Sequence, residues 1–209
     1  MKGILFKPDM IKAIVEGRKT VTRRKMQNQP TLMDKVYYKA FRKDYGGRKP
    51  RYQVGETVYI KEAWRVEKEN PIRTPDTGAI YDYDPPTIMF KADKLPHIQA
   101  LMKWESPLFL PAKYARYFIK ITDVRAEMTR NITTEDCLLE GIYSNSIYGD
   151  FGFHWESKDS GYETAKTAYF TLYDSINGKG AHEKNWDWRY EFSFESPSGV
   201  EEKNDISTS

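Results

Sequence analysis

A lysine and a threonine that could carry out acyl-transfer chemistry lie three residues apart near the start of the chain. Lys19 and Thr22 belong to a basic segment, residues 17–24, whose other polar side chains are Arg18, Thr20, Arg23 and Arg24. A threonine hydroxyl attacks an amide only after a base removes its proton, and a lysine is such a base only when burial or nearby cations lower its pKa. The same cations could instead bind a phosphate. The segment therefore predicts either amide chemistry or an anion site.

The elements around this segment decide whether the two side chains can meet. Apolar residues at helical spacing predict a helix over 9–16, which Gly17 ends, and the Thr and Val content of 19–24 predicts a strand. Successive residues of a regular strand point to opposite faces, and so do residues three apart. Lys19 and Thr22 therefore share a site only if the chain turns or bulges near Gly17. Otherwise Lys19 is a solvated cation and Thr22 an ordinary strand residue.

An acidic residue far along the chain could complete the site. Glu140 lies just before Gly141, at the end of a helix that Thr133 is expected to cap. It could orient the lysine ammonium or relay a proton, or it could be an exposed acid. A second acid lies earlier in the chain. Glu62 follows a strand predicted from the alternation of Val58 and Ile60 with polar residues, and it could line the same cleft or pair with an arginine. Trp64 could stack on a base or pack in the core.

Charge is distributed unevenly along the chain. Residues 1–53 hold 15 Lys and Arg against 4 Asp and Glu, a net charge of +11, so the remaining residues carry −8 to give the total of +3. A basic block with tyrosines among its cations predicts RNA, another nucleic acid or a nucleotide as the partner, and a solubilising basic face is the alternative. The histidines have no metal-ligand spacing and no cofactor fingerprint occurs, so we expect neither a metal nor a cofactor.

Cysteine content and hydropathy bear on the compartment. The single cysteine, Cys137, excludes an intramolecular disulfide and fits a reducing environment. Its place on an apolar helix stripe predicts a buried small residue rather than a nucleophile. No apolar run approaches the roughly 18 residues that a membrane span needs, and the first residues lack a signal-peptide pattern. We therefore expect a cytoplasmic protein without a membrane partner.

Several strands, few helices and long connections predict a mostly β fold of the α+β class, a small barrel with peripheral helices. The 209 residues fit one domain over residues 1–195, followed by a disordered Ser-rich tail at 196–209. Insertions are expected near 26–53, 67–112 and 143–163, with loops at 67–87 and 143–162. The clearest periodic elements are a long strand within 115–128, a helix over 164–176 with Ile176 on its apolar stripe, and a closing strand over 186–194 with aromatic residues on one face.

Five segments, in order along residues 3–195, resemble the ASCH domain, a PUA-like β-barrel. The first, 14–24, is similar to the opening signature of the family, and the others are 54–60, 119–124, 134–142 and 186–194. Two positions differ from the family pattern, because Glu56 stands where Asp is usual and Cys137 where Ala is usual. The longer form that contains residues 62–64 is similar to proteins encoded by phages and prophages.

The resemblance implies a PUA-like fold with a cleft for RNA, nucleotides or modified nucleosides. One bacterial branch of the family is an amidohydrolase that acts on cytidine acetylated at its exocyclic amine, and its catalytic Lys, Thr and Glu match Lys19, Thr22 and Glu140. We predict the same activity here, with those three residues as the catalytic set. The residues predicted to bind the substrate are Arg18, Thr20, Arg23, Arg24, Glu62 and Trp64. The alternative is a nucleic-acid-binding PUA-like module, of which a ribonuclease is a variant.

Overall fold

The structure, a computed structural model, describes residues 1–30, 47–67, 71–73, 80–83, 87–94, 96–145, 149–152 and 160–195. The chain separates into two compact units, one of Met1–Pro8 with Tyr59–Arg116 and one of Asp9–Val58 with Tyr117–Ser209. Each unit therefore joins segments that are distant in sequence. The predicted tail and residues 31–46 of the predicted basic insertion lie outside the described residues, and the single domain over 1–195 stays a prediction.

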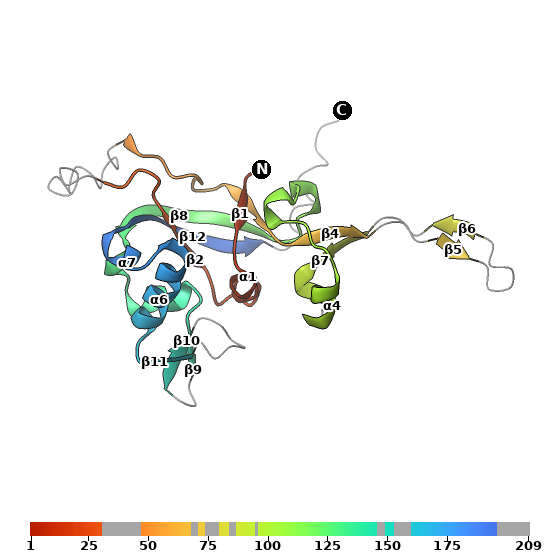
Figure 1. Ribbon diagram of the computed structural model, residues 1–209. Helices are drawn as coiled ribbons and strands as arrows, with labels where there is room; N and C mark the ends of the chain where they lie inside the picture. Colours follow the sequence, from red (N-terminus) through yellow and green to blue (C-terminus); the bar gives the residue numbers. More distant parts are fainter. Residues whose placement is uncertain are drawn as a thin grey trace. The chain divides into compact units, whose positions relative to one another are not determined.

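The largest sheet has five strands and is mixed. Its strand order is β1 (Gly3–Leu5), β3 (Thr57–Lys61), β8 (Phe118–Met128), β12 (Trp186–Glu195) and β2 (Val21–Lys25) (Figure 1). β1 runs parallel to β3, whereas β12 is antiparallel to both of its neighbours, β8 and β2. The predicted α+β class, built mainly from strands, is confirmed. The described strands form no closed barrel, because their order ends at β1 on one edge and at β2 on the other.

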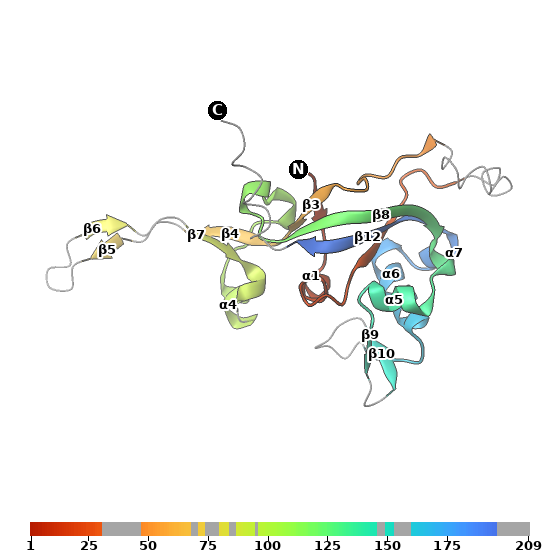
Figure 2. The ribbon, with the colours of Figure 1, turned by 180° about the vertical axis from the view of Figure 1, so that it is seen from behind.

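Two helices of the second unit lie on the same side of β8 and β12 (Figure 1, Figure 2). They are α5 (Thr134–Leu139) and α6 (Ala165–Asn177). The Thr133 hydroxyl accepts a hydrogen bond from the amide of Asp136, as its predicted capping role requires. The buried residues of α6 are Ala165, Ala168, Tyr169, Leu172 and Tyr173. The prediction that Ile176 belongs to the apolar stripe of this helix was wrong. Ile176 is 53 % exposed in the last turn of α6, beyond Tyr173, the last buried residue of the helix.

A tight turn connects helix α1 (Pro8–Val15) to strand β2. Gly17 has φ 75°, a left-handed conformation that glycine adopts without steric cost, and it ends the helix as predicted. The amides of Arg18 and Lys19 both donate to the carbonyl of Ala13, at 2.9 Å each. The chain thus makes the turn that a shared site near Gly17 demands, and Lys19 lies before the strand rather than in it.

Short strands replace two of the predicted loops. In the second unit, β9 (Tyr143–Asn145), β10 (Asp150–Gly152) and β11 (Ser160–Tyr162) form a three-stranded sheet with β10 in the centre. In the first unit, β5 (Pro71–Arg73) pairs with β6 (Ile80–Tyr83). The loop predictions were wrong for these residues because strands of three or four residues are too short to display a period of two.

The rest of the first unit combines one strand pair with short helices. β4 (Trp64–Glu67) is antiparallel to β7 (Thr87–Phe90). The described residues after β7, most of them within the insertion expected near 67–112, hold short helices, namely η2 (Lys91–Asp93), α4 (Pro96–Leu101), η3 (Pro107–Phe109) and η4 (Ala112–Tyr114). Two further short helices of the described residues, η5 (Thr129–Asn131) and α7 (Ala181–Lys184), belong to the second unit.

Candidate active site

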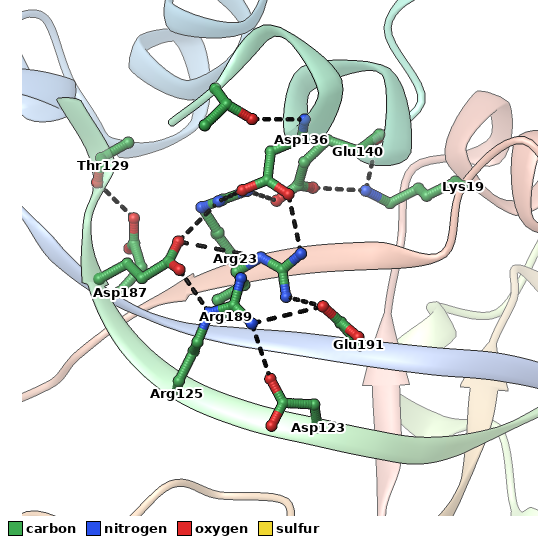
Figure 3. A network of polar contacts seen from close by, with 12 residues as sticks. Lys19, Arg23, Asp123, Arg125, Thr129, Asp136, Glu140, Asp187, Arg189 and Glu191 are labelled. Carbon is green, nitrogen blue, oxygen red and sulfur yellow. Dashed lines mark hydrogen bonds and ion pairs between the residues drawn. The ribbon is translucent and has the colours of Figure 1, made fainter. Parts of the chain in front are cut away.

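One face of the sheet formed by β2, β12 and β8 carries charged side chains on all three strands. Residues opposite each other on antiparallel strands share a face. The register aligns Arg23 with Arg189 and Arg189 with Arg125, and the same face continues at Asp187 and Glu127. Figure 3 shows these side chains gathered beneath α5. The opposite face of β12 holds the aromatic residues, so the predicted aromatic face exists but has a charged counterpart that the sequence analysis did not single out.

Lys19 projects from the turn into this charged cluster. Its side chain is 1 % exposed, and Nζ donates to the Val21 carbonyl at 2.8 Å, to the Glu140 carbonyl at 2.6 Å and to Glu140 Oε2 at 2.7 Å. Burial lowers the pKa of the Lys19 amine, the negative charge of Glu140 opposes that shift, and the positive charges of Arg24 and Arg23 add to it. This amine therefore releases its proton more readily than an exposed lysine would.

Glu140 comes from the end of α5, where it is the C-cap residue and only 6 % exposed. Its two carboxylate oxygens have different partners, because Oε2 accepts from Lys19 and Oε1 accepts from Arg23 Nη1 at 3.2 Å. The pairing joins residues 121 positions apart in sequence. The convergence of Lys19 and Glu140, which the resemblance implied, is thus present in the structure.

Arg23 lies deeper in the cluster than its predicted substrate-binding role requires. Its side chain is 0 % exposed, and Nη2 donates to Glu127 at 2.8 Å and to Asp136 at 2.6 Å. Arg189 donates to the other Asp136 oxygen at 2.8 Å. Although burial alone would raise it, the pKa of Asp136 is lowered by hydrogen bonds from Arg189 and Arg23. Charge is therefore balanced locally, as buried ions require.

Thr22 is buried, with 4 % of its residue exposed, but it belongs to the other side of β2. It is in register with Tyr190, whereas Arg23, the next residue, faces Arg189 and reaches Glu140. Because adjacent strand residues point to opposite faces, the Thr22 hydroxyl lies on the aromatic face and not with Lys19 and Glu140. The structure thus brings two of the three predicted catalytic side chains together.

The other predicted binding residues of the second unit have varied positions. Arg18 pairs with Glu16 at 2.6 Å near the surface. The backbone amide of Thr20 donates to the Leu139 carbonyl at 3.0 Å, which holds the start of β2 against the end of α5. Arg24 is in register with Trp188 and therefore shares the aromatic face with Thr22.

Glu62 and Trp64 belong to the first unit and have partners there. Glu62, whose side chain is 3 % exposed, accepts two hydrogen bonds from Arg116, at 2.9 Å each, so the alternative of an arginine pair is the one observed. Arg116 also donates to both carboxylate oxygens of Asp93. The Trp64 ring packs 5.9 Å from the ring of Tyr114.

Cys137 has the packing role that its helix position predicted. Cys137 is 0 % exposed and packs in the same core as the buried residues of α6. Burial raises the pKa of its thiol to about 12. A thiol that stays protonated at neutral pH is a poor nucleophile.

Sequence reasoning missed Arg189, Asp187, Glu127 and Asp136. A signal was available in two places, because charged residues alternate with apolar ones in 123–127 and with aromatic ones in 186–192. Alternation of this kind normally indicates one solvated face. Here α5 and α6 cover part of the charged face, so that Arg23, Asp187 and Arg189 are buried, whereas Asp123, Arg125 and Glu191 stay about 40 % exposed.

Comparisons with known proteins give no relative of this chain. No family model matches it, and neither the curated proteins nor the solved structures contain a significant match. Among the described residues, no helix has the length and apolar character to cross a membrane. In the same part of the chain, no three His, Cys, Asp or Glu side chains are grouped so that they could hold a metal ion.

Proposed function

We propose that this chain is an amidohydrolase that removes an acyl group from the exocyclic amine of a modified pyrimidine nucleoside similar to N4-acetylcytidine. The observation that carries the proposal is the buried pair of Lys19 and Glu140, in which a lysine of lowered pKa contacts a carboxylate 2.7 Å away. A buried lysine of lowered pKa beside a carboxylate is typical of sites of acid–base catalysis. The ordered motifs that resemble the ASCH domain support a PUA-like fold and a cytoplasmic nucleoside or RNA substrate.

The reaction needs one proton acceptor and one proton donor. Water adds to the acyl carbon, the bond from that carbon to N4 breaks, and the products are a carboxylic acid and the free amine. In the structure Nζ donates three hydrogen bonds, as an ammonium does, so Lys19 first releases one proton to solvent and becomes the free amine. The amine then accepts the proton of the attacking water and, as an ammonium, returns a proton to the departing N4. Glu140 stabilises the ammonium that forms between the two steps. Because Nζ is buried with three acceptors, the substrate must replace at least one of them.

The nucleophile is assigned to water because Thr22 lies on the other face of β2. We expect Thr22→Val to keep the kcat of acyl-nucleoside hydrolysis within a few fold of the unmodified protein. The assay uses the full chain with N4-acetylcytidine and longer N4-acyl analogues, and release of cytidine is followed by chromatography. Loss of all turnover in Thr22→Val, with an unchanged melting temperature, would instead identify its hydroxyl as the nucleophile. Absence of turnover by the unmodified chain on every acyl nucleoside would refute the proposed function.

Nucleic-acid binding is the second candidate, favoured by the net charge of +11 in residues 1–53. Part of this charge is neutralised within the molecule, since Lys19 and Arg23 contact carboxylates. Binding of single-stranded RNA through the remaining cations should weaken steeply with salt, with log K falling linearly against log salt concentration. A titration between 50 and 200 mM salt measures the number of phosphate contacts, because two contacts with a single strand correspond to a loss of about 7-fold and each further contact increases it. Affinity that does not change with salt, or no binding at all, would exclude this candidate.

A further inference from the structure

The carboxylate of Glu140 is divided between two cations of different kinds. Oε2 accepts from Lys19 Nζ at 2.7 Å, and Oε1 accepts from Arg23 Nη1 at 3.2 Å (Figure 3). A carboxylate that is free to rotate could present either oxygen, or both, to the ammonium. With Oε1 engaged, only Oε2 is directed at Lys19.

Arg23 is itself held in place by acids on two other elements. Its Nη2 donates to Glu127 on β8 and to Asp136 on α5, at 2.8 and 2.6 Å. The guanidinium is planar and rigid, so contacts at one end fix the direction of the other. The Arg23 side chain is 0 % exposed, and both of its Nη atoms already donate to carboxylates of the protein.

We propose that Arg23 is a positioning residue, which holds Oε1 of Glu140 so that Oε2 faces the amine of Lys19. This inference rests on the proposed function for its catalytic meaning and replaces the substrate-binding role expected from the sequence. Arg23 acts through Glu140 and makes no contact with the reacting atoms.

The charge of Arg23 has a separate effect from its shape. Burial is the main reason for the lowered pKa of Lys19, and the positive charge of Arg23 lowers it further. Arg23 also engages a carboxylate that would otherwise interact with Lys19 alone. Removal of the charge therefore raises the pKa of Lys19, whereas a substitution that keeps the charge but not the planar fork disturbs the orientation of Glu140.

Two substitutions separate these effects. Arg23→Gln removes the charge, and we expect the pKa of Lys19, followed by the NMR signal of its labelled Cε, to rise by about one unit. Arg23→Lys keeps a cation but cannot donate to three carboxylates from one fixed plane. We expect it to leave the pKa of Lys19 nearly unchanged, to lower kcat about 10-fold or more, and to change KM little.

Arg189→Lys is the matched control. Arg189 is also buried and bonds to Asp136, yet among the contacts of the described residues it does not reach Glu140. Because Arg189 reaches Glu140 only indirectly, through the acids that also hold Arg23, we expect Arg189→Lys to lose stability as Arg23→Lys does but to lower kcat much less, with the pKa of Lys19 unchanged. Equal losses of kcat in the two lysine variants would reduce Arg23 to a structural role and overturn the proposal.

The NMR titration also keeps this inference distinct from the proposed function. If no acyl nucleoside is turned over, the hydrolase assignment fails, but a raised pKa of Lys19 in Arg23→Gln still supports control of the pair by Arg23. If turnover occurs and neither arginine substitution at position 23 changes kcat or that pKa, the hydrolase assignment stands and the positioning role is overturned.

Discussion

Lys19→Met is expected to lower kcat/KM for N4-acetylcytidine hydrolysis by about 10²–10⁴-fold, the range that a general acid–base group contributes. Methionine has a similar length and no proton to transfer. It is compatible with the site because the lysine side chain is buried, and because Glu140 would keep Arg23 as a cationic partner. We expect a loss of stability of only about 1–3 kcal/mol, from the hydrogen bonds that disappear. Steady-state kinetics and urea denaturation measure the two effects.

Lys166→Met is the control for this change. Lys166 is an exposed lysine on α6, so its substitution removes the same charge from the surface and leaves the ionic cluster intact. Its kcat/KM should equal that of the unmodified protein. Full activity in Lys19→Met would show that Lys19 transfers no proton in the reaction. An equal loss in Lys166→Met would show that the loss follows from removal of a positive charge rather than from the loss of a proton-transfer group.

The local features of the site were predictable from the sequence. The end of α1 at Gly17, the cap of α5 at Thr133 and the amphipathic face of α6 each depend on residues within one or two turns. Such signals need no knowledge of the rest of the chain. The approach of Glu140 to Lys19 is different, because 121 residues separate them and only the resemblance to the ASCH domain suggested it.

The charged face of β12 could not be predicted from its own strand. Asp187 and Arg189 are charged and alternate with aromatic residues, and charged residues are rarely buried without partners. Arg189 is buried against Glu127 of β8 and Asp136 of α5, and Asp187 is buried against the hydroxyls of Thr129 and Tyr173. A prediction from the sequence of β12 alone therefore assigns these side chains to solvent, whereas Asp187 and Arg189 are 0 % and 2 % exposed.

The position of Thr22 shows the limit of transferring a motif. Its spacing from Lys19 is that of the family signature, and the turn at Gly17 provides the required bend. The face on which Thr22 points is determined by the register of β2 on β12, which pairs it with Tyr190. No pattern within the segment of residues 17–24 specifies that register.

Asp187 predicts an unusual dependence of stability on pH. Its carboxylate accepts from the Tyr173 hydroxyl at 2.7 Å and bonds to the Thr129 hydroxyl, which also donates to the Asn185 carbonyl. Burial raises the pKa of Asp187 to about 6, the bonds from Thr129 and Tyr173 oppose that shift, and the charge of Glu140 adds to it while that of Arg23 opposes it. Its register partners on the neighbouring strands are Lys25 and Glu127.

The sign of the effect follows from the raised pKa. Between about pH 4 and pH 6 the folded protein holds a proton on Asp187 that the unfolded chain has released, so stability falls as the pH rises through this window. From the ordinary value of 3.8 to about 6 is about two pKa units, which corresponds to about 3 kcal/mol. The penalty is complete above about pH 6 and absent below about pH 4.

Asp187→Asn should remove this penalty while keeping the hydrogen bonds. The amide oxygen can accept from Tyr173, and the amide nitrogen can donate to Thr129, whose own proton then goes to Asn185. We expect the variant to match the unmodified protein near pH 4 and to exceed its free energy of unfolding at pH 8 by up to about 3 kcal/mol. Urea denaturation of both proteins from pH 4 to pH 8 gives the difference directly.

Asp187→Ala distinguishes the charge from the hydrogen bonds. It abolishes the ionisation but leaves the buried hydroxyl of Tyr173 without this acceptor, which costs about 1–3 kcal/mol. The Thr129 hydroxyl keeps the Asn185 carbonyl as its acceptor. We therefore expect it to be less stable than the unmodified protein at pH 4, where Asp187→Asn is not. The difference in stability between Asp187→Asn and the unmodified protein could instead stay constant from pH 4 to pH 8. That result would mean that Asp187 is ionised in the folded state throughout, and that the cations of the cluster, rather than a bound proton, balance its charge.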